Sequence, residues 1–398
     1  MVNYLIRRIF QMAIVLLFSS AASYALLNLA PGGPLSFLST VQNRLKGEDI
    51  ARVRAYFELD LFLPYRFSRW LVGQPQGPIT IGGRTFLADY VVGCRQPLEQ
   101  QVKQASGKFA SKVVGCKPGQ SVTLTDLVGR KNASHGVLFG DFGNSWQITR
   151  DRPVSVLVLS RLPRTLQLMV LSILISIFIG VPLGVYSAVK QYSIFDYTVT
   201  SLAFFGSSMP TFFFGLLMIL LFSITFKSLG WFYLPSGNAL AVKDYTIPLL
   251  GRINAGSLQD GLLHLIMPVS VLVMFNVSGW SRFIRTSMLE VLRQDYVRTA
   301  RAKGLIERVV IARHALRNAL IPFITIVVFS IPAVFGGAII TETVFNWPGM
   351  GRLYFDALGR TDYPVAMALL LITAFLTVIA TLTSDILYTV VDPRIRLS

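Results

Sequence analysis

The chain has 398 residues, of which 53% are hydrophobic and only 14% are charged, and its mean hydropathy is +0.57. This composition excludes a disordered, collagen-like or coiled-coil chain, and the charged fraction is far below the roughly 25% of soluble domains. The formal net charge of +17 accompanies long uncharged stretches, so it indicates a membrane protein with no nucleic-acid partner. Two cysteines and three histidines leave little room for a metal cluster, and no metal site is expected.

Six uncharged stretches are long enough to cross a hydrocarbon core about 30 Å thick, which takes about 20 helical residues. Lipid offers no partner to an open strand edge, so all six are predicted to be helices. They are Ile9–Ala30, Thr165–Val189, Tyr197–Phe226, Gly261–Ser281, Ala319–Thr341 and Tyr363–Ser384. The first also suits a signal peptide because Arg7 and Arg8 precede it, but its apolar run exceeds the about 7–15 residues of a signal h-region.

Basic residues in short loops near the span ends predict the orientation in the membrane. They are Arg7, Arg8, Lys190, Arg394 and Arg396, and in the loop between the fourth and fifth spans Arg293, Arg298, Arg301, Lys303, Arg308, Arg313 and Arg317. With six spans, all of these residues lie on one side. We expect that side to be the cytoplasm, with both termini inside.

The spans divide the chain into three expected parts. Residues 1–30 form the cytoplasmic N-terminal end and the first transmembrane helix, and residues 31–161 form an extracytoplasmic domain. Residues 162–398 form the core domain, with five transmembrane helices and a cytoplasmic loop over 287–318. Apolar residues recur at i, i+4 and i+8 within Gly47–Val72, which predicts a helix there, and Gly, Pro and β-branched residues after it predict short strands and turns.

A short repeat lies in the extracytoplasmic part. Val91-Val92-Gly93-Cys94-Arg95 recurs as Val113-Val114-Gly115-Cys116-Lys117. Two cysteines in equivalent contexts and in an oxidising compartment favour a disulfide between Cys94 and Cys116. Two buried free thiols remain the alternative, whereas a metal site lacks further ligands nearby.

Residues for catalysis or energy coupling are scarce. The sequence has no Walker motif, no Ser–His constellation and no compact carboxylate pair, so neither enzymatic activity nor a cofactor bound by this chain is expected. Ion-coupled transporters usually keep ionisable residues inside the membrane. Here His264 and Asp385 lie near span ends, where an interfacial or packing role is the simpler interpretation.

Small and helix-perturbing residues occur within the spans. Gly180 and Gly184, at i and i+4, allow close helix approach. The third span is interrupted by Ser207, Ser208, Met209 and Pro210. Small polar side chains beside a kink are the candidate pathway-lining residues, and ordinary transmembrane packing is the alternative.

The loop from Asp295 to Pro322 carries the most specific pattern in the chain. Tyr296–Lys303 has helical character with small Ala300 and Ala302 on a basic background, and Gly304 then allows the chain to turn. A basic amphipathic helix on anionic lipid is the alternative. That alternative explains the arginines but not the run of small residues that ends in glycine.

This loop resembles the "EAA" loop of ABC importer permeases, in the form found in the oligopeptide/dipeptide/nickel branch. The resemblance rests on Thr299-Ala300-Arg301-Ala302-Lys303-Gly304-Leu305 followed by His314-Ala315-Leu316. Further motifs match the first permease subunit of that branch, in order and over nearly the whole membrane part. They are Leu5–Ile9, Ala30–Pro34, Gly140–Ser145, Thr341–Phe345, Pro348–Gly351, Asp362–Pro364 and Val391–Ile395.

The resemblance implies an all-α polytopic membrane protein with six transmembrane helices, similar to the permeases of type I ABC importers. It implies a multi-pass subunit of the cytoplasmic (inner) membrane of a prokaryote, paired with a homologous second permease. Two ATPase subunits, which carry ATP and Mg²⁺, and an extracytoplasmic solute-binding protein complete the assembly. Residues 299–305 would contact the ATPase. The candidates for the binding-protein side are Asp141, Phe142, Glu342 and Trp347.

Three departures from the family pattern stand out. Arg298 occupies the position of the motif's glutamate, as is usual in this branch, and the proline common after His314-Ala315-Leu316 is absent. Residues 74–135, which contain both cysteines, are an insertion. We expect them to form a mixed α/β extracytoplasmic module near the docking site of the binding protein, with a purely stabilising decoration as the alternative.

The sequence therefore predicts a binding-protein-dependent importer subunit, with di- or oligopeptides as the expected cargo. Nickel, another metal chelate or an oligosaccharide are alternatives within this class. An ion-coupled secondary transporter and a membrane-anchored receptor are alternatives of other classes. The loop that ends in Gly304 discriminates, because a receptor has no use for it.

Overall fold

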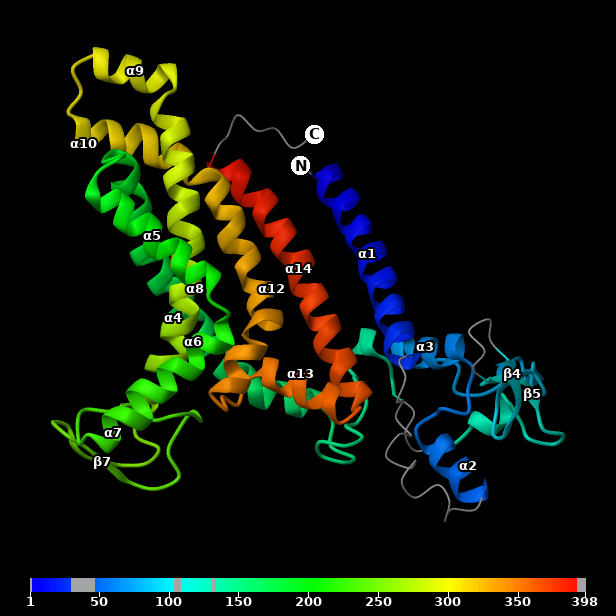
Figure 1. Cartoon of the computed structure of the whole chain (residues 1–398). Coiled ribbons are helices and arrows are strands. Elements are labelled where there is room, and N and C mark those ends of the chain that lie inside the picture. Colours follow the sequence, from blue (N-terminus) through cyan, green and yellow to red (C-terminus); the bar gives the residue numbers. More distant parts are fainter. Residues whose placement is uncertain (1, 30–46, 104–108, 131–133, 392–398) are drawn as a thin grey trace. The chain divides into compact units, whose positions relative to one another are not determined.

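The computed structural model describes residues 2–29, 47–103, 109–130 and 134–391 (Figure 1). The motif segment Ala30–Pro34 and most of Val391–Ile395 lie outside the described residues. The chain divides into two compact units. The core unit comprises Met1–Leu16, Leu159–Phe355 and Leu371–Ser398, and the second unit comprises Leu17–Val158 and Asp356–Leu370.

Helices dominate the described residues. The long helices are α1 (Val2–Leu29), α4 (Val154–Val189), α8 (Leu258–Leu292), α12 (Ile321–Val344) and α14 (Tyr363–Val391). The shorter ones are α2 (Gly47–Tyr56), α3 (Leu63–Val72), α5 (Ile194–Ser208), α6 (Thr211–Met218), α7 (Phe226–Ser228), α9 (Asp295–Ala302), α10 (Glu307–Val309), α11 (Arg317–Ala319) and α13 (Met350–Gly359). Single turns are η3 (Thr125–Leu127) and η4 (Val137–Phe139), and π-helical segments are η5 (Ile219–Thr225) and η6 (Val310–Leu316).

Among the described residues, five helices are long and apolar enough to cross a membrane. The number is six if the pair Glu307–Ala319 and Ile321–Pro332, bent by 50°, forms one span. The predicted all-α polytopic class is therefore confirmed.

The third predicted span, Tyr197–Phe226, is divided in two. α5 ends at Ser208 and α6 begins at Thr211, so only Thr211–Ser228 meets the length and hydropathy of a span. The cause is Pro210, which lacks an N–H for the helical ladder and disfavours helical backbone at the residue before it. Met209 accordingly has an extended backbone, with φ −83° and ψ 125°.

α8 continues 11 residues beyond the predicted end at Ser281 and has 35 residues in all. At 1.5 Å per residue it is roughly 50 Å long, which exceeds the thickness of a hydrocarbon core. Figure 1 shows α9 and α10 at one end of α8 and the hairpin of β7 (Tyr245–Ile247) and β8 (Gly251–Ile253) at the other. α8 therefore links the loop with the EAA-like motif to the far end of the core unit.

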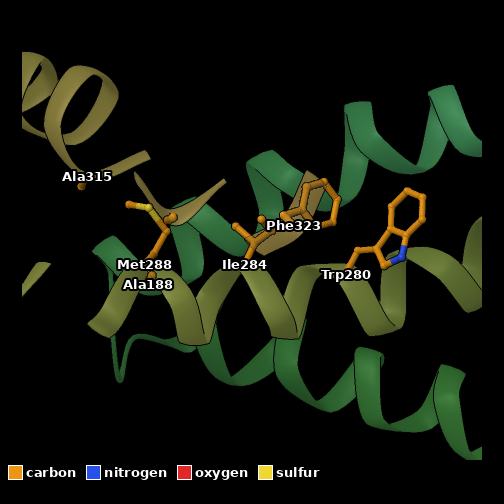
Figure 2. Packing of buried hydrophobic residues seen from close by; sticks show 7 residues of the cluster. Ala188, Trp280, Ile284, Met288, Ala315 and Phe323 are labelled. Carbon is orange, nitrogen blue, oxygen red and sulfur yellow. The ribbon is translucent and has the colours of Figure 1, made fainter. Parts of the chain in front are cut away.

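A buried cluster joins the loop-side half of α8 to four other segments of the core unit (Figure 2). Trp280, Ile284 and Met288 of α8 recur every four residues and so share one face. They pack against Ala188 of α4, Ala315 of η6, Ala319 of α11 and Phe323 of α12.

Glycine brings α4 close to α8, as the sequence predicted. A Cβ on Gly184 would lie 2.5 Å from the carbonyl oxygen of Ser281, and one on Gly180 would lie 3.6 Å from Trp280 Cβ. The gap between α4 and α8 therefore has room for a Cβ at position 180 but not at position 184. Any side chain at 184 would push the two helices apart.

The second unit contains the expected short strands. They are β1 (Ile79–Ile81), β2 (Arg84–Phe86), β3 (Val91–Cys94), β4 (Pro97–Lys103), β5 (Phe109–Cys116) and β6 (Ser121–Thr123). β1 pairs with β2, β3 with β6 and β4 with β5, all antiparallel. Gly82 and Gly83 both have positive φ, as a two-residue hairpin turn requires.

The helical character predicted over Gly47–Val72 is confirmed, but it is divided between α2 and α3, which are separated by a turn. Glu58 has φ 56°, and Pro64 stands in the first turn of α3, where its missing N–H is tolerated. Asp60 in this turn is buried and accepts both terminal guanidinium nitrogens of Arg130, at 3.0 and 2.7 Å. The apolar spacing continues across the turn, so periodicity alone did not reveal the break.

Cys94 and Cys116 are joined in a disulfide, with their Cα atoms 5.7 Å apart. The two copies of the repeat nevertheless differ in their packing. A Cβ on Gly93 would lie 2.1 Å from the carbonyl oxygen of Asp60, whereas nothing lies within 4 Å of one on Gly115. Gly93 therefore permits the strand to pass against the turn after α2, and Gly115 has no such constraint.

Removing the disulfide is expected to destabilise the second unit by about 3 kcal/mol, because the bond closes a loop of roughly 20 residues in the unfolded chain. The test is the C94S/C116S double variant, with the free energy of unfolding of this unit measured by proteolysis under native conditions. Alkylation of the unreduced native chain should add no label. Two labelled thiols in that control would contradict the bond.

Candidate functional site

The α9 segment exposes one face and buries the other. Val297 and Ala300 are buried and pack on Val310 of η6 together with Val291 and Leu292 at the end of α8. The remaining residues of the EAA-like motif are exposed, namely Thr299, Arg301, Ala302, Lys303, Gly304 and Leu305. The structure thus brings these predicted contact residues together on one surface, except Ala300, which anchors α9.

Gly304 ends this surface with a left-handed turn. Its φ is +77°, and its N–H donates to the carbonyl oxygen of Arg301 at 2.9 Å. Residues other than glycine adopt this conformation at a cost of roughly 1–2 kcal/mol. No atom lies within 4 Å of a Cβ at this position, so the glycine is required by the backbone conformation and not by space within the chain.

An ion pair spans the turn. Arg301 donates to both carboxylate oxygens of Glu307, at 3.1 and 2.7 Å. The hydrogen bonds from Arg301 lower the pKa of the Glu307 carboxyl. Because the pKa is lowered on folding, the ion pair stabilises the turn fully at pH values above the ordinary carboxyl pKa. This stabilisation is lost only as the pH falls through the lowered pKa of the folded chain, so the turn is unaffected near neutral pH.

A buried ion pair fixes α8 to the start of α5. Arg285 of α8 donates to Asp196 at 2.6 and 2.8 Å, and Asp196 also accepts from the Ser187 hydroxyl and from the N–H of Tyr192 at 2.9 Å. The hydrogen bonds from Arg285 hold the pKa of the Asp196 carboxyl far below its ordinary value, against the opposing effect of burial. Arg285 is one turn from Met288, so this pair positions the part of α8 that carries α9.

Breaking this pair is expected to destabilise the core unit strongly. Asp196→Ala should lower the free energy of unfolding by about 3 kcal/mol, because it leaves the Arg285 guanidinium without its partner in a mostly buried site. D196A/R285A should cost less than the sum of the two single variants, because they share one interaction.

The measurement is denaturant unfolding of the purified protein. Asp295→Ala is the matched control, because the Asp295 side chain is 97% exposed. The pKa of Asp196 is lowered, so the loss for D196A should be the same at pH 6 and pH 8. Equal stability of D196A and the control variant would contradict the positioning role.

Glu342 holds a second site together. Its side chain is 0% exposed and accepts from the Thr165 hydroxyl at 2.9 Å and from the N–H of Arg352 at 2.9 Å. Thr165 in turn accepts from the N–H of Met350 at 2.7 Å. α12, α4 and the start of α13 are therefore joined through one carboxylate, and we name this cluster of Thr165, Glu342, Gly349, Met350 and Arg352 the Glu342 latch.

Gly349 and Trp347 complete the loop of the latch. A Cβ on Gly349 would lie 2.3 Å from Glu342 Oε1, so a side chain there would push the carboxylate out of its hydrogen bonds. Trp347 is 0% exposed, and its Nε1–H donates to the carbonyl oxygen of Arg164 at 3.1 Å. Glu342 and Trp347 are thus buried within the core unit, and their placement supports a structural role, not direct contact with a binding protein.

The second unit carries Asp141 and Phe142 in a tight turn. Asp141 accepts from the N–H of Gly143 at 2.9 Å and from the N–H of His135 at 2.7 Å. Burial raises the pKa of this carboxyl, but these hydrogen bonds outweigh it and the net shift is downward. Phe142 follows and lines a cavity that is described below.

Asp362, next to this turn in the same unit, was not singled out by its chemistry in the sequence. It is fully buried and accepts from the Ser145 hydroxyl at 2.6 Å. It also accepts from the consecutive N–H groups of Trp146, Gln147 and Ile148 at 2.9–3.0 Å. The carboxylate therefore fixes the backbone that follows Gly140–Ser145, which joins two of the sequence motifs in space.

The proposed pathway residues lie at the break between α5 and α6. Ser207 is half-buried and donates to the carbonyl oxygen of Phe204 at 3.1 Å, while Ser208 and Pro210 are exposed. A Cβ on Gly206 would lie 2.3 Å from Ser278 Oγ, so α5 packs tightly on α8 just before the break. Their role in a pathway stays a prediction.

The ionisable residues near the span ends have partners. His264 Nδ1 donates to the carbonyl oxygen of Asp260 at 2.8 Å, and Asp385 pairs with Arg8 at 2.7 Å. Asp260 itself accepts from Tyr245 and from the N–H of Ala241, both at 2.9 Å. These contacts agree with the packing role that the sequence favoured.

Metal-binding groups are absent from the part of the chain that the structure describes. Within residues 2–29, 47–103, 109–130 and 134–391, no three His, Cys, Asp or Glu side chains come together in a way that could hold a metal ion. Among the described residues, the α9 surface is instead marked by exposed small and basic side chains.

Comparison of the sequence with known proteins identifies a family. A model described as "Binding-protein-dependent transport system inner membrane component" matches residues 180–397, more than half of the chain. The oligopeptide transport system permease protein AppB of Bacillus subtilis (strain 168) is 43% identical over 257 residues, which cover 65% of this chain and 76% of AppB.

Two further relatives have similar values. The dipeptide transport system permease protein DppB of Escherichia coli (strain K12) is 41% identical over 272 residues, which cover 66% of this chain and 78% of DppB. The di/tripeptide transport system permease protein DppB of Pseudomonas aeruginosa (strain UCBPP-PA14) is 42% identical over 246 residues, which cover 60% of this chain and 72% of that protein. The chain therefore belongs to the family of binding-protein-dependent transport system inner membrane components.

Proposed function

We propose that the chain is one of two homologous permease subunits of an ATP-driven importer of di- or oligopeptides. The observation that carries the proposal is the α9 surface, on which small and basic side chains are exposed while Val297 and Ala300 anchor the helix. In the proposal this surface docks on an ATPase subunit. ATP and Mg²⁺ bind to that partner, and this chain contributes no catalytic group and holds no cofactor.

The peptide cargo is proposed from the relatives, whose names specify oligopeptide, dipeptide and di/tripeptide transport. Specificity among peptides rests with a solute-binding protein that delivers the cargo. In the proposal this protein docks on the extracytoplasmic side, where the second unit and its module over 74–135 lie.

The proposed orientation places α9 and both termini in the cytoplasm of a prokaryotic cell. Basic residues around α9 support it, since cytoplasmic loops carry an excess of Lys and Arg. The assembly is completed by the homologous second permease and two ATPase subunits in the inner membrane.

The packing supports a mechanical role for α9. Val297 and Ala300 pack on Val310, and the cluster around Ile284 and Met288 continues from there to α4 and α12. Because packed interiors resist compression, a displacement of α9 moves these helices as a body. ATP-driven closure of the two ATPase subunits would in this way reorient the pathway between outward and inward openings.

The test is uptake of a labelled dipeptide by proteoliposomes that contain this chain, its partner permease, the ATPase subunits and the binding protein. We expect uptake only with ATP inside, with competition by dipeptides and not by nickel or oligosaccharides. Uptake driven by an ion gradient without ATP would overturn the proposal in favour of a secondary transporter. Competition by nickel or an oligosaccharide alone would keep the importer and overturn the cargo.

A further inference from the structure

The second unit contains a cavity of about 140 Å³ whose lining comes from the second half of α1, the end of α2 and the turn after it, α3, Ser134, the loop over 141–146, Asp151 and the start of α14. All of these lining residues belong to one compact unit. The cavity is smaller than the roughly 300–1,000 Å³ of pockets for drug-sized ligands. It therefore suits a small ligand, and two charged side chains in its lining that have no ion-pair partner among the described residues indicate which kind.

Arg66 provides the positive charge. Its guanidinium donates to Asn28 Oδ1 and has no carboxylate within 4.0 Å among the described residues. Outside the described residues the sequence contains one Asp or Glu, which is Asp392. A guanidinium has five donors and matches a carboxylate in a bidentate manner, so Arg66 is prepared for an anionic group from another molecule.

Asp151 provides the negative charge on the same lining. It accepts from the Tyr56 hydroxyl and has no cationic side chain within 4.0 Å among the described residues. The other carboxylates of the lining are already engaged: Glu58 pairs with Arg69 at 2.6 Å, and Asp141 accepts from His135 and Gly143. Arg66 and Asp151 form no ion pair with each other, so each can take an oppositely charged group of a ligand.

The rest of the lining suits a side chain and a peptide group. Phe57, Phe142 and Trp146 offer aromatic faces for an apolar side chain. Trp70 also lines the cavity and is only 9% exposed.

We propose that this cavity binds a short zwitterionic peptide, with the peptide carboxylate on Arg66 and its ammonium group toward Asp151. The charged ends of an extended dipeptide lie roughly 7 Å apart, and Arg66 and Asp151 are likewise not in direct contact. This inference rests on the peptide import proposed above and adds to it a cargo site on the permease itself, separate from the solute-binding protein.

The test uses the full chain in its complex, in nanodiscs and without the binding protein. The probe is radiolabelled L-alanyl-L-phenylalanine, compared with its C-terminal amide and its N-acetyl derivative. On the native chain, each blocked end should weaken binding at least tenfold, because one charge-assisted contact is lost. Equal binding of the free and the amidated peptide, or no saturable binding at all, would overturn the proposal.

Variants assign the two ends. Arg66→Gln should weaken binding of the free peptide at least tenfold and leave binding of the C-terminal amide unchanged. Asp151→Asn should weaken binding of the free peptide at least tenfold and leave binding of the N-acetyl derivative unchanged. Arg84→Gln and Asp89→Asn are matched controls, because both residues are exposed in the same unit and outside the cavity lining. Control variants that weaken the peptide as much as R66Q would contradict the assignment.

Two further outcomes distinguish a peptide site from a lipid-headgroup site, and this inference from the proposed import function. Displacement of the peptide by glycerophosphoethanolamine would identify the cavity as a lipid-headgroup site and overturn the peptide proposal. ATP-driven uptake is measured on the same preparation with binding protein added. Uptake without peptide binding in the cavity rejects this inference alone, and loss of both rejects the proposed import function.

Discussion

Gly304→Val should lower ATP-driven peptide uptake about tenfold without lowering the amount of chain in the membrane. The backbone of Gly304 has φ +77°, which a β-branched residue adopts only with a strain of roughly 1–2 kcal/mol. Relief of that strain redirects the chain between α9 and α10, and every 1.4 kcal/mol corresponds to a tenfold change in population. The measurement is initial uptake rate normalised to membrane-inserted chain.

Gly304→Asn is the matched variant, because asparagine tolerates the left-handed conformation. No atom of the chain lies within 4 Å of an added Cβ, so the isolated subunit has room for either side chain. Recovered uptake in G304N would show that the turn conformation is what matters, and loss in both variants would show that the docked partner leaves no room. Normal uptake in G304V would contradict the coupling role.

Glu342→Ala should destabilise the core unit by about 3 kcal/mol, because the N–H of Arg352 and the hydroxyl of Thr165 lose a fully buried acceptor. Glu290→Ala on the exposed surface of α8 is the matched control and should cost less than about 0.5 kcal/mol. The measurement is the free energy of unfolding of the purified protein. Equal stability of the two variants would contradict the Glu342 latch.

A double-variant cycle with Gly349 sharpens this test. Gly349→Ala alone should be strongly destabilising, since its Cβ would lie 2.3 Å from Glu342 Oε1. In the Glu342→Ala background that clash is gone, so the second substitution should cost much less than it does alone. Additive losses would show that the carboxylate is not what restricts position 349.

The positions of the spans could be predicted because the length of an apolar stretch is visible in the local sequence. Hydropathy did not predict the end of α8 or the break after Ser208. Hydropathy stopped the fourth span at Ser281, before Arg282 and Arg285, although the helix continues to Leu292. A charged residue ends an apolar window without ending a helix. Arg285 is tolerated there because Asp196, 89 residues earlier, pairs with it.

In the candidate site, too, features set by local sequence were predictable and features set by distant contacts were not. The α9 surface was predictable, since small residues before a glycine form a local pattern, and the structure adds that Ala300 faces inward. The burial of Glu342 was not, because a glutamate near a span end suggests an interfacial position. The glycines of Pro348–Gly351 were the available signal, because a loop that must pass a side chain closely requires them.

The exposed surface of α9 is proposed to dock on an ATPase subunit in the cytoplasm. Both cysteines of the chain are joined to each other, so a cysteine introduced at Lys303 is the only free thiol. A thiol-reactive crosslinker in native membranes should join K303C to a chain identified by mass as an ATPase, and R84C in the second unit should give no such adduct. Failure of K303C to crosslink to any ATPase, or an ATPase adduct from R84C, would contradict docking of the α9 surface on the ATPase.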